Sequence, residues 1–298
     1  MRIVTRPDFD GIVCAALLYE AENIKKGVKW ISPNDMQKGL VNIQKGDIIA
    51  NLPYDKRCSL WFDHHYSNLT NEPFKGFFKI APSAAGLVFK YYKNKFQFDY
   101  RELIKETDKI DSANLSLNEI LHPEVNPYLI LSMTISSHDN SEEPYWNKLV
   151  DLLRKFEIKD ILKIPEIKHR CETTVEQNKK YKISLKEHTV IKEHVSVTDF
   201  RMLDETPTGN RFLVYSLFPE SIVNVKIRYD SKDKEKLIVS VGHSTLNRTC
   251  KVNAGKMLSE FEGGGHKGAA SCSFHISKAD DYLPKILDIL LKNEPNED

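Results

Sequence analysis

The chain has 298 residues, of which 41% are hydrophobic and 29% charged, so its composition excludes intrinsic disorder and its length favours two domains over one. Lys and Arg number 43 against 42 Asp and Glu, so the chain has no global positive field for holding long nucleic acid, and an anionic ligand must be bound locally. The five scattered cysteines argue against a disulfide framework or zinc ribbon. The apolar runs are too short for a signal peptide or a membrane helix. We therefore expect a cytoplasmic protein without a membrane partner.

The first part of the chain has the pattern of an α/β unit. Short β-branched or apolar runs alternate with turn residues, and one apolar run of helix formers follows the first strand. This order predicts a mainly parallel sheet flanked by helices. The expected strands are Arg2–Thr5, Val28–Ile31, Asp47–Ala50 and Ser59–Phe62, with a helix at Ile12–Ala21.

Helical periodicity dominates from Ser83 to Leu153, and a charged segment that begins at Pro165 predicts a connecting helix. The pattern then returns to strands, which predicts a smaller C-terminal mixed α/β domain. We therefore divide the chain into domains at 1–164 and 189–298, joined by a helix at 165–188. In the second domain we expect strands at Thr189–Thr198, Ile222–Tyr229, Leu237–Val241 and Ala269–Ile276, and helices at Val252–Phe261 and Asp280–Leu291.

Acidic residues follow the first predicted strand in the sequence Asp8-Phe9-Asp10-Gly11. Loops at the carboxyl ends of parallel strands face the ligand crevice, so two carboxylates placed there can reach one cation. The alternative is an acidic turn in which Asp10 caps the next helix and Gly11 relieves the backbone.

Asp63, His64 and His65 follow another predicted strand. A carboxylate and two imidazoles supply hard and borderline ligands together, a mixture suited to manganese, with magnesium, cobalt or zinc as alternatives. Adjacent histidines in an extended loop diverge, so one could bind metal while the other faces a substrate. The sequence Asp63-His64-His65 also has many explanations without a metal.

Near the C-terminus, Gly263, Gly264 and Gly265 precede His266. Three glycines leave backbone N–H groups able to wrap an anion, and the histidine adds a donor. Arg248 could extend this anion site. The alternatives are a flexible turn after a helix and, for the arginine, a charge that only aids solubility.

A further acidic pair, Asp108 and Asp111, has a spacing that places both carboxylates on one helical face. Either could complete a metal site whose other ligands come from distant segments. The alternative is an ordinary acidic helix end.

These motifs, in this order and at these separations, resemble the DHH phosphoesterase superfamily with its C-terminal DHH-associated domain. The resemblance covers nearly the whole chain and is strongest to the exopolyphosphatase-like or nanoRNase-like branch. It implies a catalytic N-terminal domain that binds manganese, a C-terminal domain that binds substrate, and an active site in the cleft between them. Short oligonucleotides, dinucleotides or polyphosphate are the implied substrates, and a homodimer is left open.

The resemblance also implies roles for individual residues. Asp63 would orient a neighbouring group or ligate the metal, and His65 would approach the metal or the scissile phosphate. Arg248, His266 and the glycine backbone would bind a substrate phosphate. The implied metal ligands are Asp8, Asp10, His64 and Asp111, with Asp108 as the less favoured source of the last carboxylate.

Two positions depart from the family pattern. Many relatives have a histidine where this chain has Arg6 or Val4, and an aspartate that bridges two metals where it has Asn51. A neutral amide is a poor bridge between two dications, although Asn51 could ligate one ion through its carbonyl oxygen. We therefore expect one ion rather than two, Mn²⁺ with Mg²⁺ or Co²⁺ as alternatives, and Arg6 could neutralise substrate phosphate directly.

Two functions follow. The first is hydrolysis of a phosphodiester or phosphoanhydride in a short anionic substrate, with His65 and Asp63 at the catalytic centre. The alternative is a catalytically weakened or inactive member of the superfamily that binds nucleotide or nucleic acid, for which Arg6 and Asn51 are the evidence. Bound metal and turnover distinguish them.

Overall fold

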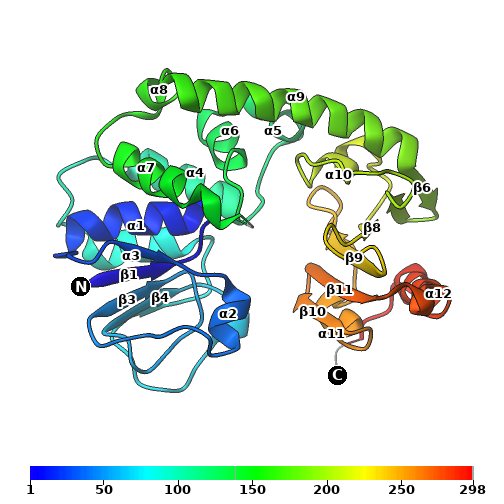
Figure 1. Cartoon of the computed structure of the whole chain (residues 1–298), viewed down its shortest axis with the longest axis horizontal. Coiled ribbons are helices and arrows are strands. Elements are labelled where there is room, and N and C mark those ends of the chain that lie inside the picture. The colour runs from blue at the N-terminus through cyan, green and yellow to red at the C-terminus, as the bar shows by residue number, and fades with distance from the viewer. Residues whose placement is uncertain (138, 297–298) are drawn as a thin grey trace. The chain divides into compact units, whose positions relative to one another are not determined.

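The computed structural model describes residues 1–137 and 139–296 and divides the chain into two compact units (Figure 1). The first unit contains Met1–Leu115 and Pro123–Thr173. The second contains Ser116–His122 and the described chain from Thr174 onward. After the short excursion at Ser116–His122, helix α9 (Pro165–His188) carries the chain from the first unit into the second.

The sheet of the first unit consists of five parallel strands in the order β2-β1-β3-β4-β5. Their short β-branched and aromatic runs suit strands that are covered on both faces. The chain moves from β1 to β2 on one side and then returns to β3 on the other, so the order reverses between β1 and β3. The strands are β1 (Arg2–Thr5), β2 (Val28–Trp30), β3 (Asp47–Ala50), β4 (Leu60–Asp63) and β5 (Gly76–Phe78).

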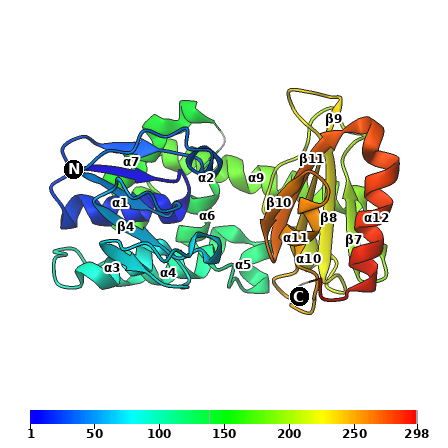
Figure 2. The same cartoon turned by 90° about the horizontal axis from the view of Figure 1, so that it is seen from below.

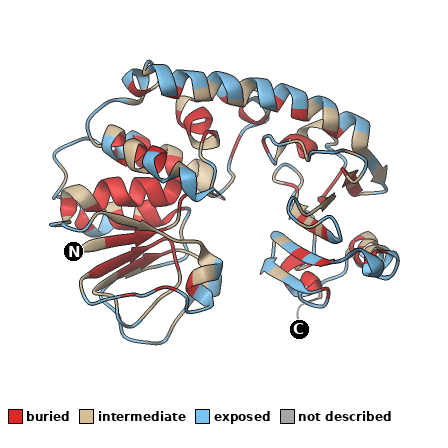
Figure 3. Ribbon diagram, viewed as in Figure 1, coloured by how far each residue is buried: buried red, intermediate tan, exposed pale blue. Residues whose placement is uncertain are grey.

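Alternate strand residues enter two cores on opposite faces of this sheet. Ile48 and Phe62 pack with α1 and its neighbouring helices in the larger core, whereas Ile49 and Trp61 join the smaller one. Helix α1 is buried along most of its length (Figure 3), which explains its uniformly apolar sequence. The helices of this unit before α9 are α1 (Phe9–Ala21), α2 (Pro33–Gln37), α3 (Ala84–Tyr92), α4 (Arg101–Asp111), α6 (Pro127–Met133), α7 (Glu143–Leu153) and α8 (Ile158–Ile161).

The carboxyl ends of β1, β3 and β4 carry the polar motifs of the first unit. Asp8 follows β1 and caps α1 by accepting a hydrogen bond from the Gly11 N–H at 2.9 Å, so Asp8 rather than Asp10 is the helix cap. Gly11 is required because an added Cβ would lie 2.0 Å from the Arg6 carbonyl oxygen. Asn51 follows β3 directly, and Asp63 ends β4. Because the strands are parallel, these segments lie at one edge of the sheet, and the strand order reverses there between β1 and β3, which is where ligands bind in open α/β folds.

The second unit is built on a six-stranded mixed sheet in the order β10-β11-β9-β8-β7-β6, in which only β7 and β8 run parallel (Figure 2). One sheet face packs its apolar side chains, most of them valines, against α11 and α12. Its strands are β6 (Thr189–Lys192), β7 (Val195–Asp199), β8 (Val223–Tyr229), β9 (Lys236–His243), β10 (Gly263–His266) and β11 (Ala269–His275), and its shorter helices are α5 (Leu117–Leu121), α10 (Leu213–Leu217), α11 (Ala254–Ser259) and α12 (Ala279–Lys292).

The predicted fold class is confirmed: a parallel sheet flanked by helices is followed by a connecting helix and a mixed α/β unit. Three local features differ from the prediction. Strand β5 (Gly76–Phe78) was not predicted. The expected strand at 189–198 is two antiparallel strands with a turn at Glu193, whose φ is +52°. The glycine segment at 263–266, where no strand was predicted, is a strand paired with β11.

Among the described residues, no helix combines the length and the apolar character that crossing a membrane requires.

Candidate active site

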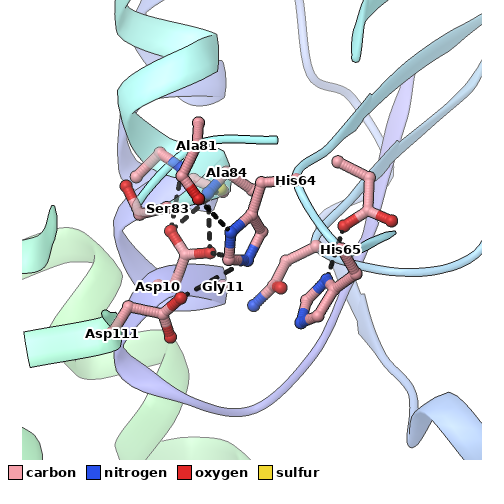
Figure 4. Close-up of polar contacts among 12 residues, drawn as sticks. Asp10, Gly11, His64, His65, Ala81, Ser83, Ala84 and Asp111 are labelled. Carbon is pink, nitrogen blue, oxygen red and sulfur yellow. Dashed lines mark hydrogen bonds and ion pairs between the residues drawn. The ribbon is translucent and has the colours of Figure 1, made fainter. Parts of the chain in front are cut away.

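Asp10 lies in the first turn of α1 and is buried, with 1% of its surface exposed. Its carboxylate oxygens accept hydrogen bonds from the backbone N–H groups of Ala84 and Ala85, at 2.9 and 2.8 Å, at the start of α3 (Figure 4). Burial raises the pKa of Asp10 to about 6, although His64 and the two N–H groups oppose this shift. A buried carboxylate at a helix N-terminus, with its outer lone pairs directed at a histidine, is suited to bind a cation.

His64 follows β4, and its two ring nitrogens face different partners. Nδ1 lies 2.9 Å from the Ala81 carbonyl oxygen, which accepts only if Nδ1 carries the proton. In the neutral ring Nε2 then carries a lone pair, and this atom lies 3.3 Å from Asp111 and 3.8 Å from Asp10. It is buried and has no hydrogen-bond partner within residues 1–137 and 139–296. A histidine that donates one N–H to a backbone carbonyl and directs the other nitrogen at carboxylates has the orientation of a metal ligand.

The two carboxylates at the end of α4 have different surroundings. An oxygen of Asp111 joins Asp10 and His64 in a group whose ligand atoms all lie within 4.8 Å of one another. Asp108 instead accepts a hydrogen bond from the Ser83 hydroxyl, which caps α3, and burial raises the pKa of Asp108. Asp108 thus supports the helix end that binds Asp10, while Asp111 faces the candidate metal centre.

Oxygen and nitrogen ligands of an ion such as Mg²⁺ lie about 2.1 Å from it, and two of them therefore lie roughly 3 to 4 Å apart. The separations at His64 fall in this range. Two carboxylates and one imidazole also have the mixed hardness that Mn²⁺ accepts. These three residues fit a single divalent ion.

Asp63 is fully buried, and both of its oxygens have partners. Asn68 donates to one at 2.6 Å, and Nδ1 of His65 lies 2.7 Å from the other. Burial lowers the pKa of His65, but the hydrogen bond and negative charge of Asp63 outweigh it and raise the pKa above its ordinary value. Asp63 and His65 also form a second candidate ligand group with His64. The contacts of Asp63 nevertheless suit an orienting role.

An Asp63→Asn variant is expected to lower the pKa of His65. An amide keeps the shape of the carboxylate but removes the charge that stabilises the imidazolium. Burial, which lowers the pKa of His65, then has the larger effect. The pH at which His65 loses its proton therefore moves down. NMR titration of the ring Cε1–H in metal-free protein measures the change directly, and an unchanged or higher pKa would contradict this account.

Asp8 does not belong to either candidate ligand group. Its carboxylate accepts from Gly11 and from Nδ2 of Asn51, each at 2.9 Å, and pairs with Nε of Arg6 at 2.8 Å. The carbonyl oxygen of Asn51 is buried and has no hydrogen-bond partner among the residues described. Arg6 therefore lies against Asp8, and one end of the Asn51 amide remains available as a ligand.

The glycine motif lies in the second unit, where β10 forms the edge of the sheet. An added Cβ at Gly263 would lie 2.4 Å from Cys272, and one at Gly265 would lie 2.6 Å from the Ala269 carbonyl oxygen. Both glycines are thus explained by close packing, whereas Gly264 faces open space. Alternate N–H groups of an edge strand point away from the sheet. This backbone can therefore bind an anion even though it forms a strand. His266 and Arg248 are exposed, and Nε of Arg248 donates to the Thr245 carbonyl at 3.1 Å.

Three supporting residues were not found by sequence reasoning. Ser83 caps the helix that binds Asp10, the Ala81 carbonyl sets the tautomer of His64, and Asn68 holds Asp63. Ser83 has a detectable signal, because a serine before an apolar periodic run predicts a helix cap. Nothing in the sequence links that cap to Asp10, which lies more than seventy residues earlier.

No protein-family model matches the chain, and neither does any curated protein sequence. Among solved structures, a pGpG-specific phosphodiesterase from Vibrio cholerae matches with 29% sequence identity and a TM-score of 0.83. The match covers 98% of this chain and 99% of that one. The similarity therefore extends over both units.

Two further structures share the fold at lower identity. An exopolyphosphatase-related protein from Bacteroides fragilis is 14% identical with a TM-score of 0.54, covering 98% of this chain and 93% of that one. RecJ from Thermus thermophilus, solved with Mn²⁺, is 13% identical with a TM-score of 0.60, covering 98% of this chain and 52% of that one.

Proposed function

Because this chain belongs to the DHH phosphoesterase superfamily and is a metal-dependent phosphoesterase, we propose that it hydrolyses the phosphodiester bond of a linear dinucleotide such as pGpG. The similarity to the pGpG-specific phosphodiesterase, which covers nearly all of both chains, supports this substrate class. The near balance of charges supports a short substrate over long nucleic acid.

The observation that carries the proposal is the buried Nε2 of His64, which faces Asp10 and Asp111 without a hydrogen-bond partner among the described residues. Leaving a buried polar atom unpaired costs about 1–3 kcal/mol, a cost that a bound cation removes. We propose Mn²⁺ as this ion, with Mg²⁺ or Co²⁺ as alternatives. When bound, the ion supplies a Lewis acid that polarises phosphoryl oxygen and lowers the pKa of water.

The chain's own residues then orient the substrate and neutralise charge. In the proposed reaction the oxygen of water adds to phosphorus and the bond from phosphorus to the ribose O3′ breaks. In net, the proton that the water loses is taken up by O3′. His65, held by Asp63 and with a raised pKa, donates a hydrogen bond to the phosphate as negative charge develops. In the second unit, Arg248, His266 and the backbone of 263–265 are proposed to bind a terminal phosphate of the substrate.

Purified full-length protein with Mn²⁺ should convert pGpG to GMP. Anion-exchange chromatography of the nucleotides measures this conversion. Cyclic di-GMP, a longer RNA and tripolyphosphate serve as competing substrates, and we expect each to react at least 10-fold more slowly. Turnover of tripolyphosphate but not of pGpG would overturn the dinucleotide assignment. No manganese binding and no turnover of any substrate would overturn the metal-dependent mechanism.

A further inference from the structure

Arg6, Asp8 and Asn51 form a polar cluster beside the candidate metal centre. The Arg6 side chain is 37% exposed and pairs through Nε with Oδ2 of Asp8 at 2.8 Å. Nδ2 of Asn51 donates to Oδ1 of the same carboxylate at 2.9 Å. The Gly11 N–H donates to that Oδ1 as well. The Asp8 charge is therefore neutralised by groups of the protein itself.

Asn51 makes this arrangement possible because an amide has a donor end and an acceptor end. An aspartate at the same position could not donate to Asp8, and two carboxylates about 3 Å apart repel each other unless a cation lies between them. Asn51 also has a φ of +56°, a backbone conformation that asparagine tolerates better than most residues. The amide thus removes the need for a cation between positions 8 and 51.

The lone pairs of Asp8 also argue against a second cation at this position. Both lone pairs of Oδ1 accept N–H groups, and Oδ2 faces a guanidinium. A second ion bound to Oδ2 would have to displace Arg6. Asp10, His64 and Asp111 remain as the ligands of one ion.

We propose that the Arg6 guanidinium takes the place of a second metal ion. Asp8 holds the guanidinium at Nε, and the Nη groups bind a phosphate oxygen of the substrate while a single divalent ion occupies the centre formed by Asp10, His64 and Asp111. Arginine suits this task because it stays charged and binds phosphate through several N–H groups. The substrate part of this inference rests on the proposed phosphodiesterase function, whereas the metal count does not.

The first test counts manganese in the full chain by equilibrium dialysis and elemental analysis. Wild-type protein should bind about one Mn²⁺ with an uncoupled six-line EPR spectrum. The double variant Arg6→Ala with Asn51→Asp should bind about two, with a spin-coupled spectrum, because it restores a pair of carboxylates and removes the competing cation. Two tightly bound ions in wild-type protein, or one in a folded double variant, would overturn the inference.

The second test uses the single variant Arg6→Ala, which retains Asn51 and adds no charge. It should keep one Mn²⁺ and lose roughly 10- to 100-fold in kcat/KM for pGpG, as expected for one charge-assisted hydrogen-bonded contact. Arg57→Ala is the matched control, because Arg57 forms a similar half-exposed ion pair with Asp55, also two residues away. Equal kcat/KM in the two variants would overturn the role of Arg6.

The two proposals can fail separately. One Mn²⁺ per wild-type chain without turnover of pGpG would overturn the proposed substrate and support the metal count. Two ions with rapid turnover of pGpG would support the phosphodiesterase function and overturn the substitution of Arg6 for an ion.

Discussion

A His64→Ala variant is expected to lose stoichiometric metal binding and about 10³-fold in rate, since several kcal/mol of transition-state stabilisation by a metal corresponds to that factor. The imidazole faces both carboxylates of the candidate centre and is held there by the Ala81 carbonyl. Without it, Asp10 and Asp111 offer an ion only two carboxylates. Asp10 cannot move far to compensate, because it is fixed by two backbone N–H groups.

Manganese content and thermal unfolding with and without Mn²⁺ measure this effect independently of substrate. A ligand that binds the folded state stabilises it by roughly 2.7 kcal/mol at a concentration of 100 times Kd, so wild-type Tm should rise with Mn²⁺ and that of the variant should not. His169→Ala is the control, because His169 is exposed on α9. A variant that keeps its manganese and its rate would contradict the ligand role of His64.

A Gly265→Ala variant is expected to destabilise the second unit by several kcal/mol. Gly265 has a φ of +149°, and a side chain in such a conformation costs about 1–3 kcal/mol. The added methyl group would also lie 2.6 Å from both the Ala269 carbonyl oxygen and Cα of Ala270, and overpacking of this kind costs a further 1–3 kcal/mol, roughly. Because β10 is an edge strand whose strand partner in the sheet is β11, we expect the hairpin to separate before the rest of the sheet.

Thermal unfolding should show Tm lowered by roughly 5–15 °C for Gly265→Ala. The matched variant Gly264→Ala should change Tm little, because its Cβ would meet no atom within 4 Å. If the backbone at Gly264 binds phosphate, that variant raises KM for pGpG without loss of stability. Equal destabilisation by both substitutions would show that the glycines serve only as a flexible segment.

The fold was predictable where the chain repeats simple patterns. The apolar runs at Arg2–Thr5 and Asp47–Ala50 are strands with the predicted limits, because short β-branched segments between turn residues have few alternatives. Strand β5 and the glycine strand β10 were not predictable in this way. Gly76–Phe78 has two aromatic residues but is too short to show a period, and Gly263–Gly265 have no side chain that favours a strand. Each segment pairs with a neighbouring strand that supplies the hydrogen bonds.

The sequence by itself indicated which side chains lie at the candidate site, because Asp8, Asp10 and Asp63-His64-His65 follow predicted strands and the carboxyl ends of parallel strands lie together. It could not assign different tasks to Asp8 and Asp10. Tertiary structure decided that assignment: Asp10 receives backbone N–H groups from α3, whereas Asp8 receives Asn51 and Arg6. The physical reason is that the environment of a carboxylate depends on which distant donors packing brings to it, and donors more than forty residues away leave no local pattern.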